Sequence, residues 1–88
     1  MDINSPCAVN ALKYIKKALR KKDRVSFNDV MGCDECKKFS VKEIGTALEL
    51  LRRNGLVKAS SKFGCSELLE FSASAVTDEG EAFLKNHR

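Results

Sequence analysis

The segment from Gly45 to Leu84 constrains the fold more strongly than any other part of this 88-residue chain. It reads GTALELLRRNGLVKASSKFGCSELLEFSASAVTDEGEAFL and predicts, in order, the end of a helix, two strands joined by a short basic loop, and another helix. The helix end is Asn54-Gly55, a pair typical of left-handed helix C-termini. A two-stranded hairpin is only marginally stable alone in water, so we expect its apolar side to cover a helical core.

The two strands of the hairpin have predicted boundaries. Residues 56–59 predict the first strand, and residues 60–66 predict a loop or the hairpin tip. Apolar and polar residues alternate over 69–75, which indicates a half-buried strand. The alternation changes at Ala75-Val76, where we expect a bulge or the end of the strand.

Each expected helix follows a residue whose side-chain hydroxyl suits the N-cap position. These residues are Ser5, Ser26, Ser40 and Thr77. Pro6 strengthens the first signal, because proline is favoured at the first helical position. Asp29 and Glu43 complete capping boxes with Ser26 and Ser40, so a short second helix is expected near Phe27 and a third from Ser40. Arg24-Val25 is a candidate for a short third strand.

The third helix, residues 40–54, has an apolar and a polar face. The residues expected to be buried are Val41, Ile44, Ala47, Leu48 and Leu51. The residues expected to be exposed are Lys42, Gly45, Thr46, Glu49, Arg52 and Arg53. The first helix is also amphipathic, and its polar face carries Lys13, Lys16, Lys17 and Arg20. Such a charge run is usually a solvated helix face, and phosphate contact is the alternative.

Composition indicates a soluble globular chain, with 43% hydrophobic and 32% charged residues. Its length allows one core, so we expect a single domain over residues 1–88. No apolar run approaches the ~20 residues of a membrane span, and no signal-peptide pattern is present, so we expect a cytoplasmic protein without a membrane partner. We expect neither an enzyme nor a cofactor, because the chain has no glycine-rich phosphate loop and no nucleophile with a histidine partner.

Four cysteines leave three interpretations open. Cys33 and Cys36 form a CxxC motif, but zinc sites normally need a second pair, and the only candidates to supply it are Cys65 and Cys7. The preferred interpretation is that the thiols are reduced and that Cys7 and one of the pair are small, partly buried side chains. A redox pair and a metal or iron–sulfur site at residues 33–36 are the alternatives, and either would lie between the second and third helices.

Two motifs in the second half of the chain resemble those of a known superfamily. Leu51-Arg52-Arg53-Asn54-Gly55-Leu56-Val57 resembles the end of the recognition helix and the next strand in MarR-like and PadR-like transcriptional regulators. Val76-Thr77-Asp78-Glu79-Gly80 resembles their return strand and closing helix. The resemblance covers about residues 8–86 and implies a winged helix-turn-helix. This is an α+β, mostly α fold with a three-helix core, a two- to three-stranded antiparallel hairpin wing and a C-terminal helix.

The resemblance implies a DNA-binding protein, namely a transcriptional regulator that binds duplex DNA as a homodimer through its first and last helices. The helix at 40–54 would enter the major groove and the wing at 58–66 would lie on the backbone. Basic side chains of the first helix would contact phosphates that flank this site. The candidate DNA-binding residues are Lys42, Gly45, Thr46, Arg52, Arg53, Lys58, Lys62, Lys16, Lys17 and Arg20.

Some features of the sequence keep other functions open. The net charge of +4 favours polyanions only moderately, and Glu43 and Glu49 on the third helix would repel phosphates. The N-terminal half of that helix has no Asn, Gln or Arg for bidentate base contacts. The alternatives are a winged-helix module that binds another protein in a larger assembly, and a thiol- or metal-responsive regulator that uses the CxxC at 33–36.

Overall fold

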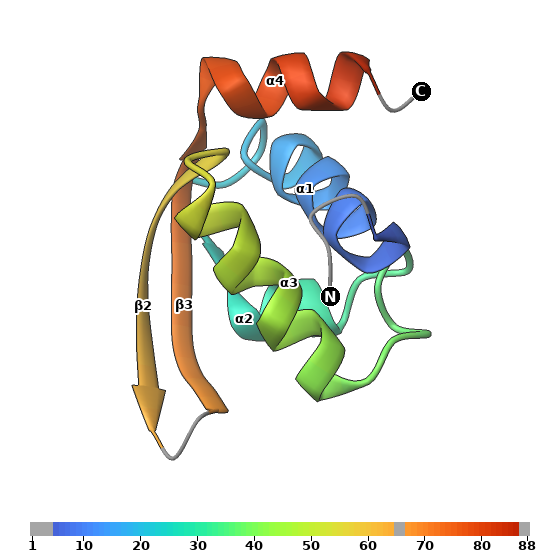
Figure 1. The fold of residues 1–88 in the computed structure, drawn as a ribbon, viewed down its shortest axis with the longest axis vertical. Coiled ribbons are helices and arrows are strands. Elements are labelled where there is room, and N and C mark those ends of the chain that lie inside the picture. The colour runs from blue at the N-terminus through green and yellow to red at the C-terminus, as the bar shows by residue number, and fades with distance from the viewer. Residues whose placement is uncertain (1–4, 65–66, 87–88) are drawn as a thin grey trace.

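A computed structural model of the chain describes residues 5–64 and 67–86. Within them, four helices and a three-stranded antiparallel sheet form a small α+β domain (Figure 1). The elements are α1 (Pro6–Ala18), β1 (Val25–Ser26), α2 (Phe27–Met31), α3 (Val41–Arg53), β2 (Val57–Gly64), β3 (Glu67–Val76) and α4 (Asp78–Lys85). The strand order is β1-β3-β2, so β3 is central and pairs with both neighbours.

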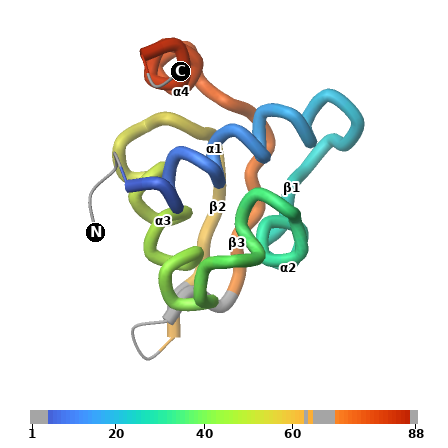
Figure 2. Tube along the Cα trace, turned by 90° about the vertical axis from the view of Figure 1, so that its right-hand side faces the viewer, coloured from blue at the N-terminus to red at the C-terminus, as the bar shows by residue number. Residues whose placement is uncertain are grey.

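The helices and the sheet form two layers. Helices α1, α2 and α3 lie on one side of the sheet, whereas α4 crosses one end of the molecule (Figures 1 and 2). The start of α3 and the far end of the hairpin lie at the opposite end of the long axis from α4. The two ends of the molecule are therefore built from different elements.

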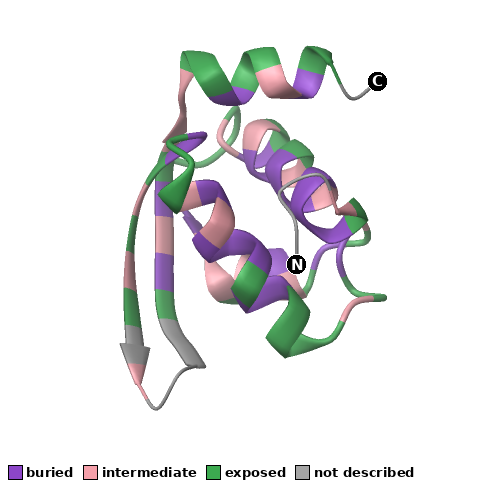
Figure 3. Cartoon of the chain, in the orientation of Figure 1, coloured by how far each residue is buried: buried purple, intermediate pink, exposed green. Residues whose placement is uncertain are grey.

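The core lies between the helical layer and the sheet, where the buried faces of α1, α3 and β3 meet (Figure 3). Its large, fully buried side chains include Leu12, Ile15, Ile44, Leu48 and Leu51. Phe71 and Ala73 of β3 close the core from the sheet side. The apolar side of the hairpin thus covers the helices, as expected from its marginal stability in isolation.

The predicted helix starts are confirmed by the capping hydrogen bonds. The Asp29 N–H donates to the Ser26 hydroxyl at 3.2 Å, and the Ser26 N–H donates to the Asp29 carboxylate at 3.0 Å. Ser40 and Glu43 make the same reciprocal pair at the start of α3. Each pair satisfies backbone donors that a helix N-terminus leaves without intrahelical partners.

Hydrogen bonds connect the residues that follow α3 with the start of α4. Gly55 adopts φ 71°, a left-handed conformation that favours glycine, and the Leu56 N–H donates to the Leu51 carbonyl at 3.0 Å. The Thr77 hydroxyl then donates to the Gly55 carbonyl at 2.6 Å, and the Thr77 N–H to the Leu56 carbonyl at 3.0 Å. Gly80 is buried against Leu56. The two motifs singled out in the sequence therefore contact each other.

The structure differs from the sequence predictions in the length of β2 and at the start of α3. Strand β2 continues to Gly64, so the predicted loop is wrong over residues 60–64, because these residues pair with β3. The predicted strand end at Ala75-Val76 is confirmed, since β3 ends at Val76, and a register shift between Lys58 and Ala59 leaves Ser74 as an extra residue of β3. Val41 is 60% exposed rather than buried, because it lies in the first turn of α3.

Candidate functional site

The exposed surface of α3 is narrow. Lys42 and Thr46 are exposed and Leu50 is half-buried, and their spacing of four residues places them on one face of the helix. The Thr46 hydroxyl donates to the Lys42 carbonyl at 2.9 Å. Sequence reasoning missed Leu50, although its distance of four residues from Thr46 was a signal for it. We call Lys42, Thr46 and Leu50 the α3 stripe.

Two residues expected on the exposed face of α3 are buried, so these predictions are wrong. Gly45 is buried and offers no open backbone to a ligand. Glu49 is only 6% exposed, because the hairpin lies beside this side of the helix and Ser61 of β2 contacts the carboxylate. The helix therefore has a covered flank that a helical wheel does not reveal.

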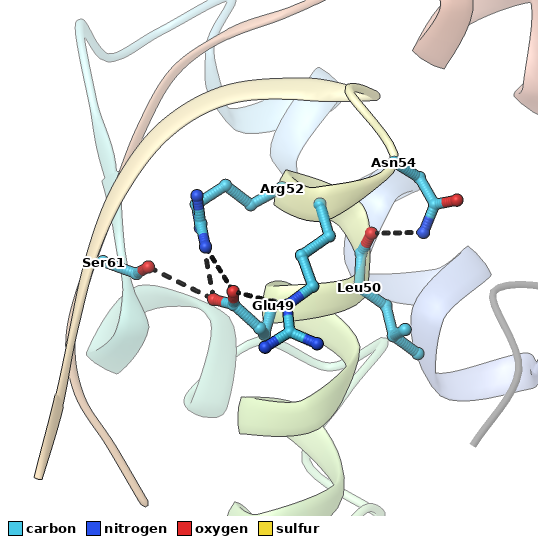
Figure 4. A network of polar contacts seen from close by, with 6 residues as sticks. Glu49, Leu50, Arg52, Asn54 and Ser61 are labelled. Carbon is cyan, nitrogen blue, oxygen red and sulfur yellow. Dashed lines mark hydrogen bonds and ion pairs between the residues drawn. The ribbon is translucent and has the colours of Figure 1, made fainter.

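Glu49 is the centre of a polar network that connects α3 with the hairpin (Figure 4). The Arg52 guanidinium binds both of its carboxylate oxygens, and the Arg53 Nε donates to it at 3.1 Å. The Ser61 hydroxyl donates to it from β2 at 3.2 Å. The hydrogen bond from Arg52 is the largest cause that holds the pKa of Glu49 below its ordinary value. Arg52 and Arg53, predicted DNA contacts, therefore have an internal anionic partner.

The other carboxylate of α3, that of Glu43, accepts a hydrogen bond from the backbone. The Ser40 N–H donates to Glu43 Oε1 at 3.2 Å, so this carboxylate lies at the N-terminus of the helix. The partial positive charge of a helix N-terminus stabilises an acid at this position. Glu49 is therefore compensated by two arginines, whereas Glu43 is an exposed charge that the helix N-terminus stabilises.

The hairpin supplies two cations to the outer face of β2. Lys58 and Lys62 are exposed, as is Ser60 between them on the same side of the strand. Lys62 lies opposite Glu70 in the strand register. Among the residues whose side chains the structure describes, neither lysine makes an ion pair. The predicted wing at 58–66 is described only to Gly64, and its last two residues lie outside the described part.

The basic residues of the first helix do not lie on the same surface as the α3 stripe and the hairpin lysines. Lys16 pairs with Glu81 of α4 at 3.4 Å, and Lys17 lies 3.9 Å from Glu35. Lys16 and Arg20 line a groove between α1 and α4, at the end of the molecule opposite the start of α3 (Figures 1 and 2). The structure thus divides the predicted DNA-binding residues between two regions.

The described cysteines are core side chains. Cys7, Cys33 and Cys36 are free thiols that are 2%, 8% and 0% exposed. Burial raises the pKa of Cys7 to about 11, and burial together with a hydrogen bond to Cys33 raises the pKa of Cys36. Among the described residues, no group of three His, Cys, Asp or Glu side chains is arranged to hold a metal ion. Cys65, the remaining candidate ligand, lies outside those residues.

Comparisons with known proteins do not identify a relative. No protein-family model, curated protein or solved structure shows significant similarity to the chain.

In the described part of the chain, no helix has the length and apolar character that crossing a bilayer requires. Inferences about function therefore depend on the α3 stripe, the hairpin lysines and the α1–α4 groove.

Proposed function

We propose that this chain is a winged helix-turn-helix DNA-binding protein and a transcriptional regulator. In this proposal α3 enters the major groove and the β2–β3 hairpin is the wing that lies along the phosphate backbone. The order of the elements supports the proposal, because three helices precede an antiparallel hairpin and a fourth helix follows it. The protein would be a cytoplasmic binding protein rather than an enzyme.

The observation that carries the proposal is the internal pairing of Glu49, the acid in the middle of α3, with two arginines. Glu43 accepts a hydrogen bond at the helix N-terminus, and Glu49 is buried between two arginines and Ser61. Among the residues whose side chains the structure describes, Lys42, Lys58 and Lys62 have no ion-pair partner. The repulsion expected from Glu49 is therefore reduced, and these three lysines support contact with phosphate.

The α3 stripe supports modest rather than strict sequence preference. A threonine hydroxyl can bind several base edges, and an apolar side chain such as Leu50 can contact a thymine methyl group. Lys42 is a point charge that suits a phosphate as well as a base. None of these side chains makes the bidentate contact that gives the strongest discrimination between bases.

A homodimer would enlarge the contact area, because one such module buries only about 600–1,000 Å². The resemblance suggests α1 and α4 as the dimer surface. The groove between these helices is strongly basic, however, and a two-fold contact across it would bring like charges together. A dimer in this proposal therefore forms outside this groove.

Gel retardation of a random-sequence duplex tests the proposal. The test variant carries Lys42→Glu, Lys58→Glu and Lys62→Glu. The control carries Lys21→Glu, Arg24→Glu and Lys37→Glu, which make the same change in net charge at exposed positions outside α3 and the hairpin. Because each lost phosphate contact reduces the slope of log K against log salt by about 0.9, we expect the test variant to lose about 3 from that slope.

The control variant is expected to keep most of the parent slope. If the test variant binds the duplex as tightly as the parent, α3 and the hairpin do not contact DNA. Failure of the folded parent itself to retard duplex DNA at low salt would favour the alternative function, a module that docks onto another protein.

A further inference from the structure

The groove between α1 and α4 is a strongly charged hollow. It is open, has a volume of about 310 Å³, and is lined by Lys13, Lys16, Lys17, Arg20, Glu81, Leu84 and Lys85. A second hollow of about 340 Å³ shares Lys16, Arg20 and Glu81 and continues along the end of β3. Together they form one open groove lined by α1, α4 and the end of β3.

The charge of this groove is not compensated by its own residues. Five cations and one carboxylate leave a formal excess of four positive charges, equal to the net charge of the whole chain. Lys16 pairs with Glu81, and Lys17 lies near Glu35 outside the groove. Lys13, Arg20 and Lys85 make no ion pair with any residue that the structure describes. Low-dielectric walls lined by one sign of charge concentrate the field and attract polyanions.

We infer that the α1–α4 groove is a second binding site for the phosphate backbone of nucleic acid, so that one chain can hold two duplex segments. The inference rests on the proposed function, which assigns the first segment to α3 and the hairpin. The α4 end of the molecule lies opposite the start of α3 and the far end of the hairpin (Figures 1 and 2). A duplex in the groove is therefore not the continuation of a duplex held by α3.

The spacing of the cations suits a regularly charged polymer. From Lys13 to Lys17 the axis of α1 rises by about 6 Å, and Arg20 follows just after the helix end. One DNA strand presents a phosphate about every 3.4 Å of duplex axis, so the helical part of this row faces about two phosphates. Four of the five cations are lysines, which bind phosphate as point charges without bidentate geometry. The groove therefore contacts the backbone without reading sequence.

The lining argues against other polyanions. Leu84 is the only apolar side chain in the 310 Å³ groove, so an acidic peptide finds no large pocket of the kind that anchors protein interfaces. A membrane surface would require an apolar face that inserts below the headgroups, whereas the apolar face of α1 is buried in the core. Nucleic acid needs neither feature.

A capture assay tests the inference. A biotinylated duplex is fixed on beads, the protein is added, and retention of a second, fluorescent duplex is measured. The groove variant carries Lys13→Gln, Arg20→Gln and Lys85→Gln, and leaves Lys16 in place because it links α1 to α4. The control carries Lys21→Gln, Arg24→Gln and Lys37→Gln, which change the same residue types elsewhere. Circular dichroism establishes that each variant is folded.

The groove variant is expected to retard a single duplex within about threefold of the parent and to lose at least about tenfold of the capture signal. The control variant should retain the second duplex as strongly as the parent does. Unchanged capture by the groove variant overturns the inference and leaves the proposed function intact, since capture would then come from dimerisation through two copies of α3.

Two further outcomes separate the inference from the proposed function. If the α3 and hairpin variant retards a single duplex like the parent, the proposed function fails; groove-dependent retardation would then still support a phosphate site between α1 and α4. If the parent captures no second duplex but binds polyglutamate or phosphatidylserine vesicles through the groove residues, the assignment to nucleic acid is overturned.

Discussion

The close contact between α4 and the end of α3 predicts a large effect of Gly80→Ala. A Cβ atom at position 80 would lie 2.1 Å from the Leu56 carbonyl oxygen and 2.8 Å from Val76 Cγ1. The first of these atoms belongs to the backbone, so rotation of a side chain cannot relieve the overlap. Helix α4 would have to move away from Leu56 by about 1 Å to restore ordinary contact, a displacement of the kind that overpacking causes.

The expected change in the free energy of unfolding is the sum of three contributions, of which two destabilise the variant and one stabilises it. Overpacking costs about 1–3 kcal/mol, and the hydrogen bond from the Thr77 N–H to the Leu56 carbonyl contributes about 1 kcal/mol that is lost when α4 moves. Alanine favours a helix over glycine by about 1 kcal/mol. We therefore expect Gly80→Ala to lower the free energy of unfolding by about 2 kcal/mol, a large fraction of the stability of so small a domain.

Urea unfolding followed by far-ultraviolet circular dichroism measures this change, with two other glycines as matched controls. At Gly32 a Cβ atom would meet only the Asn28 carbonyl oxygen at 3.4 Å, so Gly32→Ala should be neutral or stabilising by up to about 1 kcal/mol. At Gly55 there is space but φ is positive, so Gly55→Ala should cost about 1–2 kcal/mol. If Gly80→Ala is as stable as the parent, α4 does not approach Leu56 as described.

Two other features of the structure have measurable consequences. Glu49→Gln should lower the unfolding free energy by about 1–2 kcal/mol at neutral pH, because Arg52 and Arg53 lose their anionic partner and an amide NH2 replaces one of the two accepting oxygens. The folded-state pKa of Glu49 is lowered, so its contribution is present above the unfolded-state pKa and is lost as the pH falls through the folded-state value. Urea curves of parent and variant should accordingly converge in acid, and equal stability at pH 7 would exclude the buried network. In a Cys65→Ser background, the three remaining thiols should react with an aromatic disulfide reagent only after denaturation. A pKa raised from 9.0 to about 11 leaves about 100-fold less thiolate at Cys7, and rapid native-state labelling of these thiols would contradict their burial.

The sequence predicted best those features that depend on residues close together in the chain. N-cap hydroxyls, capping boxes and the Asn54-Gly55 helix end act over three or four residues, and the structure confirms them. The length of β2 was missed because Ser60, Ser61 and Lys62 have no intrinsic strand pattern. Pairing with β3 gives them their conformation, and strand propensity is largely a matter of such context.

The candidate site was predictable to a similar extent. Exposure of Lys42 and Thr46 follows from helical periodicity, and exposure of Lys58 and Lys62 from alternation along a strand. Burial of Glu49 depends on Ser61, a residue brought into contact only by the return of the chain along α3. The groove was not predictable, because it exists only where α4 crosses α1 and adds Lys85 to the row on the first helix.

The contact between Gly55 and Thr77 also determines how the second half of the chain unfolds. The N-cap of α4 is completed by the carbonyl at the end of α3, across a separation of 22 residues. Neither helix end can lose its geometry without removing a hydrogen-bond partner from the other. Opening of the hairpin base and fraying of the last helix should therefore be a single cooperative event, and the two segments should exchange their amide hydrogens together as one folding unit.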